Sequence, residues 1–98
     1  MPSMREDEIR GVSRIFNALG DTTRVRILLL VNETRRPLHI KAVAEALDMD
    51  YAALYRHVKV LQRSDLLEVY EVGRSRVLYL KNKELIEKLI EIENKMMQ

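Results

Sequence analysis

The chain contains no cysteine and only three glycines. The absence of cysteine excludes disulfides, thiolate metal sites and thiol nucleophiles together. So few glycines leave no glycine-rich loop that could cradle a phosphate. No apolar run approaches the roughly 18 residues that a membrane-spanning helix needs, and residues 1–10 lack the pattern of a signal peptide. We therefore expect a cytoplasmic protein that has no membrane partner.

Catalytic and metal-binding patterns are also missing. The two histidines, His39 and His57, are too few for a transition-metal site unless several carboxylates join them. The acids of residues 84–93 would reach a common metal only across a dimer, and a solvated helix face explains them better. No serine lies in a nucleophile motif. We expect no enzyme, no metal and no cofactor, we identify no small-molecule ligand, and we expect His57 to serve helix packing or phosphate binding.

Composition indicates one small globular domain. The chain has 98 residues, of which 47% are apolar and 33% are charged. The net charge of +2 and the pI near 9.0 indicate a nucleic-acid partner only weakly, because the placement of charge matters more than its sum. High charge content with glutamine only at positions 62 and 98 is typical of a heat-adapted source.

Residues 41–80 are the most informative part of the chain. Their pattern predicts, in order, a helix, a tight turn, a second helix and two strands: 41–47, 48–50, 51–64, 67–72 and 75–80. Asp50 is a good N-cap for the second helix, and the strands join at Gly73-Arg74. A helix, a short turn and a helix are the arrangement that delivers a recognition helix to the DNA major groove. The basic hairpin that follows is what the term wing describes.

Three further helices are predicted outside this segment, over about 6–19, 22–31 and 82–97. Gly20 is expected to end the first of them as a C-terminal glycine does, and Asp21 to cap the second. The core candidates of the second helix are Val25, Ile27, Leu28, Leu29 and Leu30.

The predicted sheet is small. Residues 38–40 are expected to add a minimal strand beside the hairpin. Asp65 is expected to end the recognition helix, since aspartate tolerates the left-handed conformation found there. The strand formers expected to pair across the hairpin are Leu67, Val69 and Val72 with Val77 and Tyr79.

The recognition helix supplies the first candidate DNA contacts. If Leu54, Val58 and Leu61 are buried, the opposite face presents Tyr51, Ala52, Tyr55, Arg56, Lys59 and Arg63. Arg56 is suited to donate two hydrogen bonds to guanine, and small Ala52 permits close approach. The alternative is an ordinary solvated helix face. Two exposed tyrosines beside an arginine favour DNA contact, because a plain surface rarely needs them.

The wing supplies the second set. Arg74 and Arg76 flank the hairpin tip and suit phosphate contact or insertion into the minor groove. A turn kept soluble by its charge is the alternative. The position of the hairpin directly after a helix-turn-helix favours DNA contact.

Apolar stripes on the two terminal helices predict an assembly. Along residues 6–19 the stripe consists of Ile9, Val12, Phe16 and Leu19, and along residues 82–97 of Leu85, Leu89, Ile92 and Met96. We do not expect one core of this size to cover both stripes fully. We therefore expect the terminal helices to serve dimerisation, in a two-fold homodimer that reads half-sites about 10 base pairs apart, or a multiple of that.

Two segments resemble the ArsR-type (arsenic-repressor-like) winged helix-turn-helix regulators. Leu19-Gly-Asp-Thr-Thr-Arg-Val-Arg-Ile-Leu28 is similar to the opening motif of that family, and Arg56-His57-Val58-Lys59-Val60-Leu61 to its recognition helix. The resemblance covers roughly residues 10–80. It implies a mainly helical fold with a small β-hairpin, formed by four helices, two strands and a final helix. It also implies a homodimer built from the first and last helices.

Departures from the family pattern limit what carries over. Thr22 replaces the usual proline, Tyr55 stands where serine is common, and Asp65 replaces the glycine after the recognition helix. The cysteines that sense metal in well-known members are absent, so the resemblance does not imply a response to metals.

The sequence thus predicts a single winged helix-turn-helix domain over residues 1–98, whose partners are double-stranded DNA and a second copy of itself. We expect a sequence-specific transcription regulator that acts as a repressor, from an archaeal source. The alternative is a winged-helix module that joins a larger protein assembly and does not touch DNA.

Overall fold

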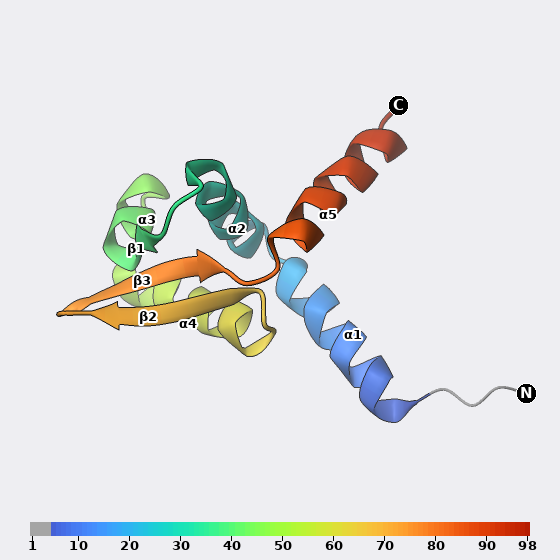
Figure 1. Cartoon of the computed structure of the whole chain (residues 1–98), viewed down its shortest axis with the longest axis horizontal. Coiled ribbons are helices and arrows are strands. Elements are labelled where there is room, and N and C mark those ends of the chain that lie inside the picture. Colours follow the sequence, from blue (N-terminus) through green and yellow to red (C-terminus); the bar gives the residue numbers. More distant parts are fainter. Residues whose placement is uncertain (1–4) are drawn as a thin grey trace, which may run out of the picture.

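The computed structural model describes residues 5–98, which form five helices and a three-stranded antiparallel sheet (Figure 1). The elements are α1 Glu6–Leu19, α2 Thr22–Thr34, β1 Leu38–His39, α3 Ile40–Ala46, α4 Tyr51–Arg63, β2 Leu67–Val72, β3 Ser75–Leu80 and α5 Lys83–Met96. This order confirms the winged helix-turn-helix fold expected from the sequence. None of the helices in the described residues is long and apolar enough to cross a membrane.

Helix starts follow the predicted caps. The side chain of Asp21 accepts a hydrogen bond of 3.1 Å from the backbone N–H of Arg24 at the start of α2. Asp50 does the same at the start of α4, with a bond of 3.2 Å from the N–H of Ala53. Each bond satisfies one of the backbone donors that the first helical turn leaves unpaired. Both caps fix where these helices begin.

The prediction for Gly20 was right about where α1 ends and wrong about why glycine suits that position. Helix α1 ends at Leu19, but Gly20 has a φ of −82°, outside the left-handed region that usually selects glycine there. A Cβ at Gly20 would lie 3.2 Å from the carbonyl oxygen of Phe16. Glycine is therefore suited to this position by close packing against the end of α1.

Helix α2 is longer than predicted. It continues to Thr34 instead of ending at Val31, and Arg35 then adopts a left-handed φ of 54°. The hydroxyl of Thr34 donates to the carbonyl oxygens of Leu30 and Val31, at 3.1 and 3.0 Å. The polar residues of 32–34 contain no helix breaker, so the helix persists until the approach to Pro37.

The register of the sheet corrects the predicted pairing. The bounds of β2 and β3 are as predicted, and β1 forms but is one residue shorter, because Ile40 begins α3. Val77, however, lies opposite Tyr70, and Tyr79 lies opposite Glu68. The two-residue turn sets this register, because it places Val72 opposite Ser75 and every other pair follows by counting. Strand β1 pairs with the other edge of β3, so β3 is the central strand.

The core lies between α2, α3, α4 and the inner face of the sheet. Its fully buried large side chains are Ile27, Leu28, Ile40, Leu54, Leu61, Leu66, Leu67 and Leu78, with Val43 and Val58. Three of the predicted α2 core residues, Val25, Leu29 and Leu30, are only half-buried. They are half-buried because Ile27, Leu28 and Val31 occupy the side of α2 that meets the core.

Candidate nucleic-acid interface

The turn between α3 and α4 determines how the recognition helix is presented. It comprises residues 47–50, and Asp48 adopts a left-handed φ of 52°. Aspartate is one of the few residues other than glycine that tolerates this conformation. The three inner side chains of α4, Leu54, Val58 and Leu61, are 0% exposed. Because this stripe is fixed in the core, the opposite face of α4 must point to solvent.

That outward face carries the residues predicted from the sequence. Tyr51, Ala52, Arg56 and Arg63 are exposed, and Tyr51 retains 40% of its accessible surface. Tyr55 and Lys59 are half-buried, which corrects the expectation of two exposed tyrosines. The Tyr55 ring packs against the core and is also covered by two cations. The structure thus brings the six candidates of α4 onto one face with graded exposure.

Those two cations come from different elements. The Nζ of Lys59, one helical turn further along α4, lies 5.2 Å from the Tyr55 ring centroid. The guanidinium carbon of Arg76, from strand β3, lies 4.4 Å from the same centroid. Arg76 also donates a hydrogen bond of 3.4 Å to the hydroxyl of Tyr51, which raises the pKa of Arg76 further above its usual value. These contacts join the wing to the first two turns of α4.

The two wing arginines, Arg74 and Arg76, therefore lie in different environments. Arg74 lies exposed in the turn beside Gly73, whose φ of 61° suits glycine. Arg76 is half-buried against α4 and does not extend from the tip. The sequence did not reveal this difference, because it depends on the face of β3 that Arg76 occupies and on the position of Arg74 in the turn before that strand.

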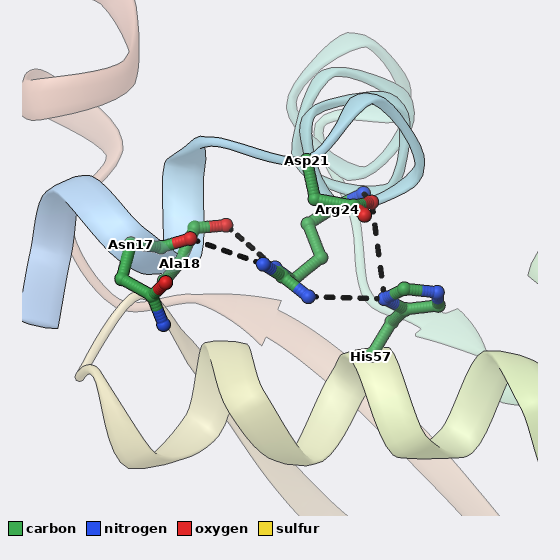
Figure 2. A network of polar contacts seen from close by, with 5 residues as sticks. All are labelled: Asn17, Ala18, Asp21, Arg24 and His57. Atoms are coloured by element: carbon green, nitrogen blue, oxygen red, sulfur yellow. Dashed lines mark hydrogen bonds and ion pairs between the residues drawn. The ribbon is translucent and has the colours of Figure 1, made fainter.

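A second network of polar contacts connects α4 to α2 and to the end of α1 (Figure 2). Arg24 of α2 donates from Nε to the carbonyl oxygen of Ala18 at 2.7 Å and from Nη2 to that of Asn17 at 3.0 Å. Its Nη1 lies 3.3 Å from Nδ1 of His57 on α4. A guanidinium only donates, so Nδ1 is the acceptor in this contact when the imidazole is neutral. Arg24 therefore links the end of α1 to the recognition helix, and His57 serves helix packing.

Arg24 was not among the predicted functional residues. Its signal in the sequence is the spacing Asp21-x-x-Arg24, in which the cap of α2 lies three residues before the arginine. The hydrogen bond from the Arg24 backbone lowers the pKa of Asp21; burial opposes the shift, and the nearby His57 and Arg24 charges add to it. One short motif thus starts a helix and fixes the position of two others.

The predicted dimerisation residues fall on α1 and α5. Five of the seven are exposed, Phe16 at 67% and Met96 at 78%, together with Ile9, Val12 and Ile92, while Leu85 and Leu89 are half-buried. Figure 1 shows α1 and α5 leaving the rest of the molecule in different directions. Between the inner end of α1, α2 and α5 lies an open apolar groove of about 610 Å³, whose lining includes Phe16, Leu29 and Leu89.

Metal-binding side chains do not cluster in the part of the chain that the structure describes. Across residues 5–98, no group of three or more histidine, aspartate or glutamate side chains is placed to hold a metal ion.

Comparison with known proteins gives three results. A family model described as a helix-turn-helix domain matches residues 19–70. An uncharacterized HTH-type transcriptional regulator of the archaeon Methanocaldococcus jannaschii is 30% identical, over 84% of this chain and 95% of its own length. Among solved structures, similarity extends to bacterial regulators.

Two of those structures illustrate the likeness. The homodimeric winged helix-turn-helix DNA-binding domain of a possible ArsR-family regulator from Mycobacterium bovis superposes with a TM-score of 0.85, at 17% identity, covering 99% of this chain and 94% of that one. HlyU from Vibrio cholerae gives a TM-score of 0.77 at 20% identity, covering 90% of this chain and 97% of its own. At such identities the structural likeness establishes the fold.

Proposed function

This chain belongs to the helix-turn-helix domain family of transcriptional regulators, with the winged fold of the ArsR type, and we propose that it is a homodimer that binds specific sequences of double-stranded DNA and represses transcription from them. In this proposal α4 enters the major groove, the wing contacts the flanking duplex, and the protein acts in the cytoplasm. Repression is the simplest action, since a dimer bound to a promoter excludes other proteins from it.

The observation that carries the proposal is the orientation of α4. Its inner stripe is completely buried, and this forces Tyr51, Ala52 and Arg56 outward in the first two turns. That end of a recognition helix is the one that meets base edges. The proposed DNA-contacting set is Tyr51, Ala52, Tyr55, Arg56, Lys59, Arg63, Arg74 and Arg76.

The homodimer rests on the exposed stripes of α1 and α5. Exposed apolar stripes of this kind mark an interaction site. The M. bovis domain, which has the same fold, is homodimeric. We propose that Ile9, Val12, Phe16, Leu85, Leu89, Ile92 and Met96 form the seam. A two-fold protein of this kind would read a pseudo-palindrome with half-sites about 10 base pairs apart, or a multiple of that.

Selection of bound sequences from a random DNA pool tests the proposal directly. We expect enrichment of such a pseudo-palindrome, with an affinity that falls steeply as salt rises. The Arg56→Ala variant should weaken binding to the selected site about 5- to 150-fold more than binding to random duplex, the range expected for a guanine-bidentate arginine. Lys88→Ala, which removes one positive charge from α5, is the matched control and should leave this ratio unchanged.

The alternative function makes the opposite prediction. A winged-helix module of a larger assembly would be indifferent to duplex DNA at every salt concentration and would form a stable complex with a different protein. That combination of results would replace the proposal. An equal loss on both DNAs in Arg56→Ala would instead move Arg56 from base reading to phosphate contact.

A further inference from the structure

Arg74 and Arg76 belong to one hairpin, but the sheet sends their side chains to different places. Successive residues of a strand point to opposite faces, so Arg76 shares a face of β3 with Leu78, which is completely buried. That inner face packs toward α4. Arg74 lies in the turn, outside this alternation. The guanidinium of Arg76 therefore leaves the sheet on the side of the recognition helix.

The contacts of Arg76 hold it in a defined orientation. Its guanidinium lies 4.4 Å from the Tyr55 ring centroid and donates to the hydroxyl of Tyr51 at 3.4 Å. The two tyrosine rings are themselves stacked, with centroids 6.2 Å apart and planes at 24°. A contact of the guanidinium carbon with an aromatic ring does not pair any N–H donor with a hydrogen-bond acceptor, and a guanidinium carries five such donors. Tyr51 takes one of them, so further donors remain for a ligand.

Tyr51 and Tyr55 occupy the first two turns of α4, the end of a recognition helix that meets base edges. We infer that Arg76, held in place by the Tyr55 ring, reads a guanine in the major groove together with α4. Of the two wing arginines, only Arg74 then contacts the DNA backbone or the minor groove. This inference rests on the proposed DNA binding. It revises the prediction from sequence, which gave both arginines the same role at the wing tip.

Guanine is the base that fits this donor set. It presents two acceptors, N7 and O6, in the major groove, and arginine is its commonest specific partner. In this assignment Arg76 is a specificity-determining residue. Tyr55 is a positioning residue, because it acts on the DNA through the arginine that it supports.

The test uses the pseudo-palindromic site obtained by selection, in which single guanines are replaced by 7-deazaguanine. This base lacks only the N7 acceptor in the major groove. We expect one guanine in each half-site at which the replacement weakens the wild-type protein at least about 5-fold and has no effect on Arg76→Ala. Arg56→Ala serves as the matched variant and should remain sensitive at that guanine. The wild-type protein and each variant are first compared by circular dichroism to establish that they are folded.

Variants of Tyr55 separate positioning from general packing. Tyr55→Phe keeps the ring and should keep the sensitivity to 7-deazaguanine. Tyr55→Leu keeps an apolar side chain without a ring and should lose it, as Arg76→Ala does. Arg74→Ala should lower affinity on all sequences and reduce the salt slope by about one, without changing the response to any 7-deazaguanine.

Two outcomes would overturn the inference. One is that Arg76→Ala loses affinity equally on selected and random duplexes and remains fully sensitive at every guanine, which would make Arg76 a phosphate contact. The other is that Arg76→Ala binds as the wild-type protein does. Failure of the wild-type protein to bind any duplex is a different result, since it would refute the proposed DNA binding itself.

Discussion

The body of the protein, formed by α2, α3, α4 and the sheet, buries its apolar side chains far more completely than the outer helices α1 and α5 do. Ten large residues of the body are less than 2% exposed. Each outer helix contributes one buried residue, Ala18 near the end of α1 and Ile86 near the start of α5. Both lie at the end where the helix joins the body, whereas Ile9, Val12, Phe16, Ile92 and Met96 are exposed. Figure 1 shows the far ends of α1 and α5 extending away from the body.

This difference separates the residues that close the core of one chain from those that we expect to join two chains. The body closes its own core, so its contribution to stability comes from contacts within one chain. The outer helices carry apolar surface that one chain leaves open, so we expect their contribution to depend on a second molecule. Substitutions in the two regions should therefore respond differently to protein concentration.

The largest expected effect comes from creating a cavity in the core of the body. Leu54→Ala removes a completely buried side chain from the inner face of α4 and leaves a cavity, which should lower the free energy of unfolding by about 2–5 kcal/mol. The loss should be the same at every protein concentration, as measured by urea unfolding over a hundredfold range. Leu54→Met is the control, since it conserves volume and should cost less than about 1.5 kcal/mol. A loss that disappears at high protein concentration would mean that one chain does not complete the core of the body without a second chain.

The next effect concerns the seam between copies. Ile92→Glu places a charge on the exposed stripe of α5 and should weaken the dimer by about 2–4 kcal/mol, the range found for central interface residues. Sedimentation at micromolar concentration should show a dimer for the wild-type chain and a monomer for the variant. Asn94→Glu adds the same charge on the opposite side of α5 and should remain a dimer. A wild-type monomer would contradict the proposed dimer.

The sequence predicted the body well because its signals are local. Turn residues fix the hairpin, an aspartate caps each of two helices, and the spacing of Leu54, Val58 and Leu61 gives the inner face of α4. These features depend on neighbours within a few positions. The fold and the face of the recognition helix follow from them.

What could not be predicted depends on contacts between distant segments. The position of Arg76 against Tyr55 follows from the register of β3 and the packing of the sheet on α4. Arg24 meets His57 only when the start of α2 lies against the middle of α4. In the sequence Arg24 looks like an ordinary surface charge and Arg76 like a residue of the wing tip, and only the tertiary arrangement shows what each side chain contacts.

Arg24 is the link between the two regions, so it gives an intermediate effect. Arg24→Ala removes two hydrogen bonds to the carbonyl oxygens of Asn17 and Ala18 and the contact with His57, and should cost about 1.5–3 kcal/mol. The substitution should accelerate amide hydrogen exchange more in α1 than in α3. Arg26→Ala, an exposed arginine on the same helix, is the control and should change neither quantity. Uniformly faster exchange would show a general loss of stability instead of a loosened α1.

The smallest expected effect is a pH dependence at the junction of the same two regions. The backbone N–H of Arg24 donates to the Asp21 carboxylate and lowers its pKa from the usual 3.8, while the folded state is intact. An acid with a lowered pKa in the folded state binds protons more readily when unfolded, so its stabilisation is complete above about pH 4 and is lost as the pH falls further. Urea unfolding of the wild-type chain between pH 6 and pH 3 should therefore show a loss that Asp21→Asn lacks, because asparagine caps a helix without titrating. Parallel pH profiles for the two proteins would mean that the charge of the Asp21 carboxylate contributes nothing to the stability of the junction between α1 and α2.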